Sequence, residues 1–272
     1  MNQHKDRNKD RNKDRSKDQH KNRHRNRSDP SPAAKALKEL LLGHGPVVTY
    51  ALVALCCAVF VLSPASGLNP VYGTGSDELL AAQRGYFQRW GVIPAELLTG
   101  DPRAALTPLT ALFVHGSWLH LLGNVLFLCV FGVMVEERMG HLQFALFYLG
   151  CGALALCAYA MANPDSQQTL VGASGAISAV LGAFLRLFPK ARVTSLFPFL
   201  FFVPLRFPAW IVLPFWVALQ WLAAQRDSGG PGVAYLAHLV GFSLGFVYAW
   251  VRYPRTARLG GTATATEGDS QP

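Results

Sequence analysis

The sequence predicts an all-α polytopic membrane protein, built as a bundle of six transmembrane helices. Of the 272 residues, 51% are hydrophobic and only 15% are charged, which is typical of a chain with several membrane spans. Six apolar segments follow one another, each near the ~20 residues that a helix needs to cross a bilayer. Backbone polar groups in lipid need partners within the protein, so each segment is expected to be helical. The expected spans are Val47–Leu62, Leu112–Val135, Leu142–Ala162, Val171–Phe188, Phe207–Ala224 and Val233–Val251.

The first 43 residues form a basic, low-complexity tail. Residues 1–32 repeat a Lys-Asp-Arg-Asn pattern, as in Lys5–Asn8 and Lys9–Asn12, and contain almost nothing apolar, and a short polar-to-apolar ramp, Ala33–Leu42, leads into the first span. Such a segment cannot offset its ordering entropy, so residues 1–43 are expected to be disordered, as are residues 253–272. Two roles fit the basic tail: a solvated arm that helps to fix topology, or a contact with anionic headgroups. The membrane domain is therefore expected over residues 44–252.

Charge and cysteine usage exclude several classes of function. The net charge is +9, but about half of the Lys and Arg residues lie in the tail, and the body has no basic patch interleaved with aromatic residues. We therefore expect no nucleic-acid partner. The five cysteines lie in apolar runs without metal-ligand spacing, so we expect neither a metal nor a cofactor.

The distribution of basic residues sets the expected orientation. With a cytoplasmic N-terminus, the cytoplasmic side holds the tail, Arg138, the basic residues between positions 186 and 206, and those after Val251. The outer side then holds only Arg84, Arg89, Arg103 and Arg226. Both termini are thus expected to be cytoplasmic, in a multi-pass protein of the cell membrane.

The connection between the first two spans, Ser63–Thr110, is much longer than the others. It contains Tyr86, Phe87 and Trp90, as a segment lying in the membrane interface would. An ordinary extracellular loop fits the sequence equally well.

The second span carries polar side chains that lipid disfavours. His120 and Asn124 are four residues apart, so they share one face of a helix, and His115 lies at its outer end. Such groups usually face the protein interior or a water-filled cavity. We expect His115, Ser117, His120 and Asn124 to line a cavity of this kind. A lone histidine in a span, however, is more often a hydrogen-bonding residue between helices than a catalyst.

The fourth span begins with a serine among small residues, Gly172-Ala173-Ser174-Gly175. At the start of a helix, Ser174 lies next to unpaired backbone N–H groups that can stabilise a negative charge. Small residues also recur at Gly175, Ala179 and Ala183, so a helix-packing face explains this segment on its own.

The sixth span offers a partner for that serine. Gly241 and Gly245 share a helix face with His238, and this smooth face would let the span approach the fourth one closely. A serine nucleophile needs a base, and histidine is the usual one. The outer halves of the spans contain no Asp or Glu, so the sequence predicts a Ser174–His238 dyad rather than a triad. His120 and Asn124 are then placed to donate to an oxyanion.

These residues closely resemble the rhomboid family of intramembrane serine proteases. The segment Gly172–Gly175 is similar to the GxSG motif of the family, and Ala237-His238 with the two glycines is similar to its AHxxGxxxG signature. The second span is similar to two further patterns, HxxxxHxxxN at His115, His120 and Asn124, and GxxxExxxG with ExR at Gly132, Glu136, Arg138 and Gly140.

The resemblance implies Ser174 as nucleophile, His238 as general base, and His120 with Asn124 as support for the oxyanion. Some members of the family have an aromatic residue four positions after the serine, stacked on the histidine. This chain has Ser178 there.

We therefore expect an intramembrane serine endopeptidase that cleaves peptide bonds in or near the transmembrane segments of other membrane proteins, which reach it through the lipid bilayer. The alternative is a catalytically inactive rhomboid-like protein that binds client proteins, although such relatives usually lack the serine or the histidine. A transporter with a histidine relay would show an internal repeat, and the sequence has none.

Overall fold

A computed structural model describes residues 45–73, 75–97, 99–197, 203–226 and 234–254. The pattern of internal contacts separates the chain into two units, Met1–Val47 and Val48–Pro272. The helix arrangement described below is that of the second unit. The expected disorder of residues 1–43 and of most of the C-terminal tail lies outside the described residues.

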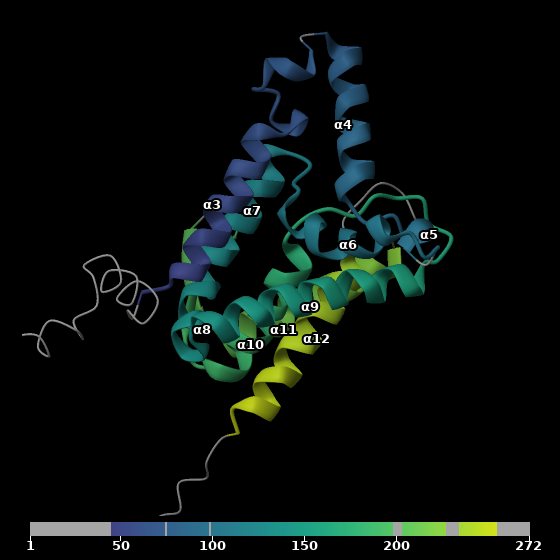
Figure 1. Ribbon diagram of the computed structural model, residues 1–272. Coiled ribbons are helices and arrows are strands. Elements are labelled where there is room, and N and C mark those ends of the chain that lie inside the picture. Colours follow the sequence, from purple (N-terminus) through teal and green to yellow (C-terminus); the bar gives the residue numbers. More distant parts are fainter. Residues whose placement is uncertain (1–44, 74, 98, 198–202, 227–233, 255–272) are drawn as a thin grey trace, which may run out of the picture. The chain divides into compact units, whose positions relative to one another are not determined.

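A helix overlaps each of the six expected spans (Figure 1). These helices are α3 (Val47–Leu62), α7 (Trp118–Phe127) continued by α8 (Val133–Met139), α9 (His141–Ala162), α10 (Ser174–Leu187), α11 (Ala209–Arg226) and α12 (Tyr235–Arg252). Within the described residues, two stretches are long and apolar enough to cross a membrane, Trp118–Met139 and His141–Ala162. The number of six crossings therefore stays a prediction.

The second span begins later than expected. A 3-10 turn, η3 (Ala111–Phe113), is followed by non-helical chain up to Ser117, whose Oγ accepts a hydrogen bond from the backbone N–H of His120 at 3.2 Å. This cap fixes the start of α7 at Trp118. The expected start at Leu112 is wrong, and His115 lies in the connection before the helix. A π-helical turn, η4 (Leu128–Gly132), joins α7 to α8.

The long first connection is mostly helical. It contains two 3-10 turns, η1 (Pro64–Ser66) and η2 (Pro70–Tyr72), and the helices α4 (Ser76–Trp90), α5 (Pro94–Leu97) and α6 (Pro102–Thr110). Its last helices pack against α9, so the connection belongs to the folded body.

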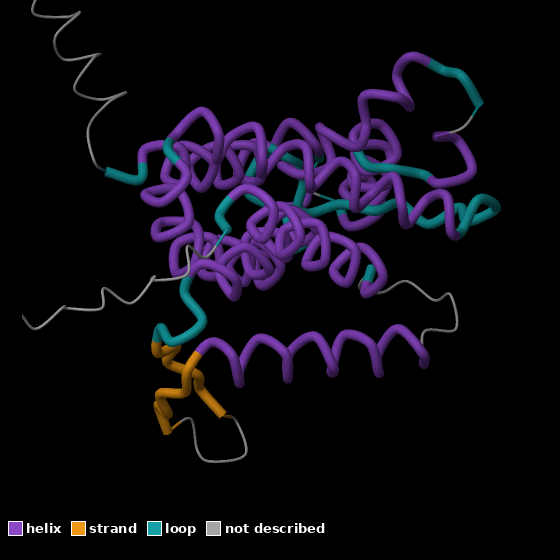
Figure 2. The backbone as a smooth tube through the Cα atoms, turned by 90° about the horizontal axis from the view of Figure 1, so that it is seen from below, coloured by secondary structure: helices purple, strands orange, loops and turns teal. Residues whose placement is uncertain are grey.

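The connection between α10 and α11 contains an antiparallel ribbon that was not predicted. Strands β1 (Arg192–Phe197) and β2 (Val203–Pro208) pair with Arg192 opposite Pro208, and Figure 2 shows the ribbon at one end of α11. The stretch Arg192–Phe197 is short and contains Val, Thr and Phe, residue types that favour strands. The bundle is otherwise helical, as expected.

Helix α10 forms the centre of the fold. All residues from Gly175 to Phe184 are buried, and α10 packs most extensively against α12. Added Cβ atoms show how close the two backbones are: one on Gly245 would overlap the carbonyl oxygen of Ala179, and one on Gly182 would overlap that of Phe242. The small-residue faces therefore serve as the contact between these helices, as the sequence indicates.

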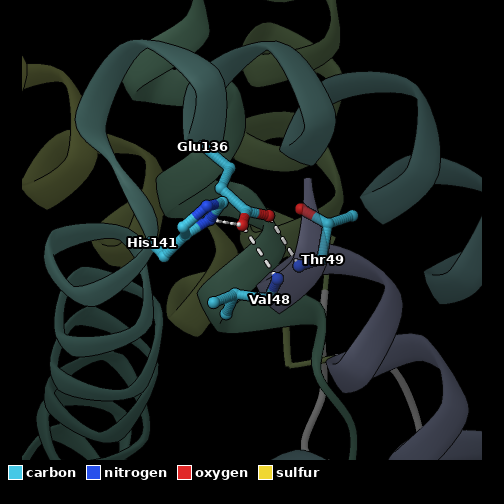
Figure 3. Close-up of polar contacts among 4 residues, drawn as sticks. All are labelled: Val48, Thr49, Glu136 and His141. Carbon is cyan, nitrogen blue, oxygen red and sulfur yellow. Dashed lines mark hydrogen bonds and ion pairs between the residues drawn. The ribbon is translucent and has the colours of Figure 1, made fainter. Parts of the chain in front are cut away.

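A buried carboxylate fixes the start of α3 (Figure 3). The side chain of Glu136, fully buried on α8, accepts hydrogen bonds from the backbone N–H groups of Val48 at 2.8 Å and Thr49 at 2.6 Å. Its Oε1 also lies 2.5 Å from Nδ1 of His141. The carboxylate satisfies two backbone donors that the helix leaves without partners and complements the positive end of the helix dipole. At the other end of α3, the Phe60 ring packs edge-on against Trp118, with 4.8 Å between centroids.

Candidate active site

Ser174 and His238 touch, although they are 64 positions apart in the chain. The Oγ atom of Ser174 lies 2.8 Å from Nε2 of His238. Ser174 is the first residue of α10, and His238 lies in the first turn of α12. The histidine is only 7% exposed. The contact has the length of a normal hydrogen bond.

Close helix packing produces this contact. A Cβ added to Gly241, three residues after His238, would overlap the carbonyl oxygen of Gly175, the residue after Ser174. Since any side chain at Gly241 would separate the two backbones, this glycine allows the short reach between the serine and the histidine.

The segment before Ser174 is held from the side of the first connection. Gly172 donates its N–H to the carbonyl of Ala111 at 2.8 Å, and Leu170 pairs with Val92 through two hydrogen bonds of 2.7 and 2.9 Å. Gly172 has a φ of +118°, which residues with a Cβ rarely adopt. The contacts with Ala111 and Val92, together with the backbone conformation of Gly172, place Ser174 next to the first turn of α12.

His120 reaches the same segment from α7. A Cβ placed on Gly172 would lie 2.6 Å from Nε2 of His120, so only glycine lets this ring approach. The backbone N–H of Gly116 donates to Nδ1 of His120 at 3.4 Å. Since Nδ1 accepts, the ring proton is on Nε2, on the side of Gly172 and two residues from Ser174.

Asn124 supplies a second donor, one helical turn further along α7. Its Nδ2 atom lies 3.6 Å from the Cβ position at Gly172. This nitrogen is buried and has no hydrogen-bond partner within the described part of the chain. A buried amide without a partner is costly and marks a place where an acceptor can bind.

A cavity of about 830 Å³ opens onto these four side chains. Its wall includes Ser174, His238, His120, Asn124 and Ser117, in agreement with the sequence for these residues. The expectation for His115 is wrong, because His115 is not part of the wall. It is 1% exposed, and its ring packs edge-on against His120 with 5.2 Å between centroids. His115 therefore supports His120 from behind, as a consequence of its place before the cap of α7.

Gln220 was not predicted as a site residue. Its Oε1 atom lies 2.8 Å from Nδ1 of His238, on the opposite edge of the ring from Ser174. Gln220 is the only amide in the expected fifth span, and a buried amide in a membrane usually faces the protein interior. That signal was present in the sequence, although it does not identify the partner.

An aromatic ring from another helix lies over His238. The ring of Trp216, on α11, is stacked at 6.1 Å between centroids and 29° between planes. The Oγ of Ser178 instead donates to the carbonyl oxygen of Ser174 at 2.7 Å. Trp216 thus provides a stacking partner that position 178 does not.

The fold and the site define a class: a helical protein with long apolar helices that enclose a serine–histidine pair at the edge of a cavity. A family model described as the Rhomboid domain matches residues 103–255, more than half of the chain. The chain belongs to the rhomboid family, whose members are membrane proteins.

Curated relatives agree with this assignment. Rhomboid protein 1, mitochondrial, of Saccharomyces cerevisiae is 32% identical over 143 residues, which cover 51% of this chain and 39% of that protein. RHOMBOID-like protein 6, mitochondrial, of Arabidopsis thaliana is 27% identical over 169 residues, 57% of this chain and 49% of the relative. The putative rhomboid protease YdcA of Bacillus subtilis is 31% identical over 77 residues, 28% of this chain and 38% of the relative. The chain matches at most about half the length of each of these relatives.

Proposed function

We propose that this protein is an intramembrane serine endopeptidase that cleaves peptide bonds in or near the transmembrane segments of membrane proteins. The observation that carries the proposal is the 2.8 Å contact between Oγ of Ser174 and Nε2 of His238 in the wall of the cavity. A serine becomes a useful nucleophile when a base at this distance can take its proton.

In the proposed reaction, Oγ of Ser174 attacks the carbonyl carbon of the substrate while its proton moves to Nε2 of His238. The resulting imidazolium then gives that proton to the departing amine, and an acyl-enzyme remains. A water molecule, activated by the same nitrogen, releases the second product and restores the serine. The polar part of the cavity wall, with Ser117 among its residues, gives this water a place to reach the ester.

The negative oxygen of the tetrahedral intermediate needs donors. His120 carries its ring proton on Nε2, next to Gly172, and Asn124 has a buried amide nitrogen without a partner among the described residues. The backbone N–H of Ser174, at the start of α10, is a third donor. We assign the two side chains to this oxyanion site, where one donor contributes about 3–4 kcal/mol to transition-state stabilisation.

The proposal extends to the substrate and to the orientation. Membrane proteins would enter from the bilayer, with both termini of the enzyme cytoplasmic and the cavity open toward the outer side. The distribution of Lys and Arg along the sequence supports this orientation in a cell membrane. The names of two relatives place those two proteins in mitochondria, and the location proposed here rests on this chain's own charge distribution.

A serine-directed fluorophosphonate probe tests the proposal on the full chain purified in detergent. We expect the wild type to be labelled and Ser174→Ala and His238→Ala to be unlabelled. Ser243→Ala is the matched control, because Ser243 is an exposed serine on α12 whose hydroxyl donates to the carbonyl of Leu239 on the same helix. This control variant is expected to label like the wild type.

Labelling that persists in Ser174→Ala contradicts the assignment of the nucleophile. A folded wild type that is never labelled, and that still binds membrane proteins, supports the inactive rhomboid-like alternative instead.

A further inference from the structure

We propose that Gln220 is a positioning residue that holds His238 in the tautomer and orientation the reaction needs, so that the working unit is Ser174–His238–Gln220. This inference rests on the proposed function. It assigns to a neutral amide of α11 the place that a carboxylate occupies in serine-protease triads.

Hydrogen-bond geometry supports this assignment. The histidine lies between two partners at equal distance, with Nδ1 2.8 Å from Oε1 of Gln220 and Nε2 2.8 Å from Oγ of Ser174. An amide oxygen only accepts, so Nδ1 carries the ring proton and donates it to Gln220. Nε2 is then unprotonated and faces the serine hydroxyl as a base.

Without Gln220 this arrangement is not fixed. A neutral imidazole can carry its proton on either nitrogen, and the tautomer with a proton on Nε2 cannot accept one from Ser174. The ring could also turn about its side-chain bonds. An acceptor at Nδ1 removes both alternatives, which is the role that the third residue has in a triad.

Packing on α11 holds the amide in place. Trp216 lies one turn before Gln220 and stacks on the face of His238, while Tyr235 of α12 meets the ring edge-on at 6.3 Å between centroids. Leu213, one turn before Trp216, is buried in the core. One face of α11 therefore presents the indole and the amide to the same ring.

Surrounding charges explain why an amide is suitable here. Among the described residues, no Asp or Glu lines the cavity, and the titratable or charged groups around it are His120 across the cavity, Tyr235 on the helix of His238 and Arg84 in the cavity wall. A carboxylate in this apolar helix would carry a large desolvation cost, whereas an amide supplies the same acceptor without a charge. Gln220 itself is not among the described residues that line the cavity.

The test uses the full chain in detergent and the fluorophosphonate probe, with the maximal inactivation rate, kinact, and the probe affinity, KI, measured from pH 5 to 10. Gln220→Met keeps the size and removes the acceptor. We expect it to lower kinact about 10- to 100-fold and leave KI unchanged, because a lost hydrogen bond to a buried group has that effect on a barrier.

Gln220→Glu keeps the acceptor and adds a charge. The carboxylate stabilises the imidazolium, so the acidic limb of the kinact profile is expected to move to higher pH, while the rate above that limb stays near that of the wild type. A residue with only a packing role would not move the limb. Gln143→Met is the matched control, because Gln143 is a half-buried amide of α9 that bonds to the hydroxyls of Tyr248 and Tyr253.

The outcomes separate this inference from the proposed function. Wild-type labelling with Gln220→Met equal to the wild type in kinact overturns the inference and leaves the protease proposal standing. An equal loss in Gln220→Met and Gln220→Glu with an unmoved acidic limb also overturns it. A wild type without Ser174-dependent labelling contradicts the proposed function itself.

Discussion

A small side chain introduced at Gly245, as in Gly245→Val, is expected to separate the two helices that carry Ser174 and His238. A Cβ at this position would overlap the carbonyl oxygen of Ala179 and lie 2.5 Å from its carbon and 2.7 Å from its Cα, whereas ordinary contacts begin at 3.4 Å. These neighbours are backbone atoms, which cannot rotate away. The helices must therefore move apart by about 1 Å, since close-packed interiors have no spare volume.

The magnitude follows from this displacement. Overpacking of a core costs about 1–3 kcal/mol, so Gly245→Val is expected to lower the apparent melting temperature in detergent by several degrees. A shift of ~1 Å lengthens the 2.8 Å contact between Ser174 and His238 beyond hydrogen-bond distance. A misplacement of that size reduces a reaction rate by ~100-fold, although Gly245 lies two turns from the histidine.

Fluorophosphonate labelling rates and thermal melts measure both effects. Gly150→Val is the matched control, because Gly150 lies on an exposed part of α9 and no described neighbour comes within 4 Å of its Cβ position. We expect this variant to melt and label like the wild type. If Gly245→Val also melts and labels like the wild type, the close approach of α10 and α12 does not set the geometry of the site.

Three further substitutions test other parts of the structure. Glu136→Ala removes the acceptor for two backbone donors and His141. We expect the free energy of unfolding, measured by heat or denaturant, to fall by about 3–5 kcal/mol, as when other buried charge contacts are broken. Glu137→Ala, at the exposed neighbour, is the control and is expected to change stability little. Gly172→Ala places a Cβ at a φ of +118° and against the ring of His120. We expect a large loss in the labelling rate with a small change in melting temperature. A wild-type labelling rate would contradict the close contact between His120 and Gly172. Asn124→Ala should lower kcat on a membrane-protein substrate about 100-fold with KM unchanged, and a change in KM alone would show that Asn124 binds substrate rather than the oxyanion.

Small residues made much of the fold predictable from the sequence. Gly241 and Gly245 lie on the same face as His238, and glycines in a span have few uses other than close helix contacts, so the approach of α12 to the Ser174 segment could be inferred. The apolar segments likewise marked the helices within a few residues, except at the start of the second span. The catalytic roles of Ser174 and His238 stay a prediction that the labelling experiments address.

Features that depend on helix rotation and on local caps were not predictable in the same way. Gln220 is the lone amide of the expected fifth span, but only the rotation of α11 selects His238 as its partner. The apolar run after Leu112 concealed a helix start at Trp118, which the Ser117 cap determines. His115 was misplaced for that reason, since it was assumed to lie on the same helix as His120.

The carboxylate of Glu136 also has a consequence for the order of assembly during translation. Its two backbone donors, Val48 and Thr49, are made almost ninety positions earlier, so the first helix leaves the ribosome long before its acceptor exists. Until then water must solvate those amides, which keeps that end of the helix at the bilayer surface. We expect the first helix to insert alone and to join the others only after the second span, which ends with α8 and carries Glu136, has entered the lipid.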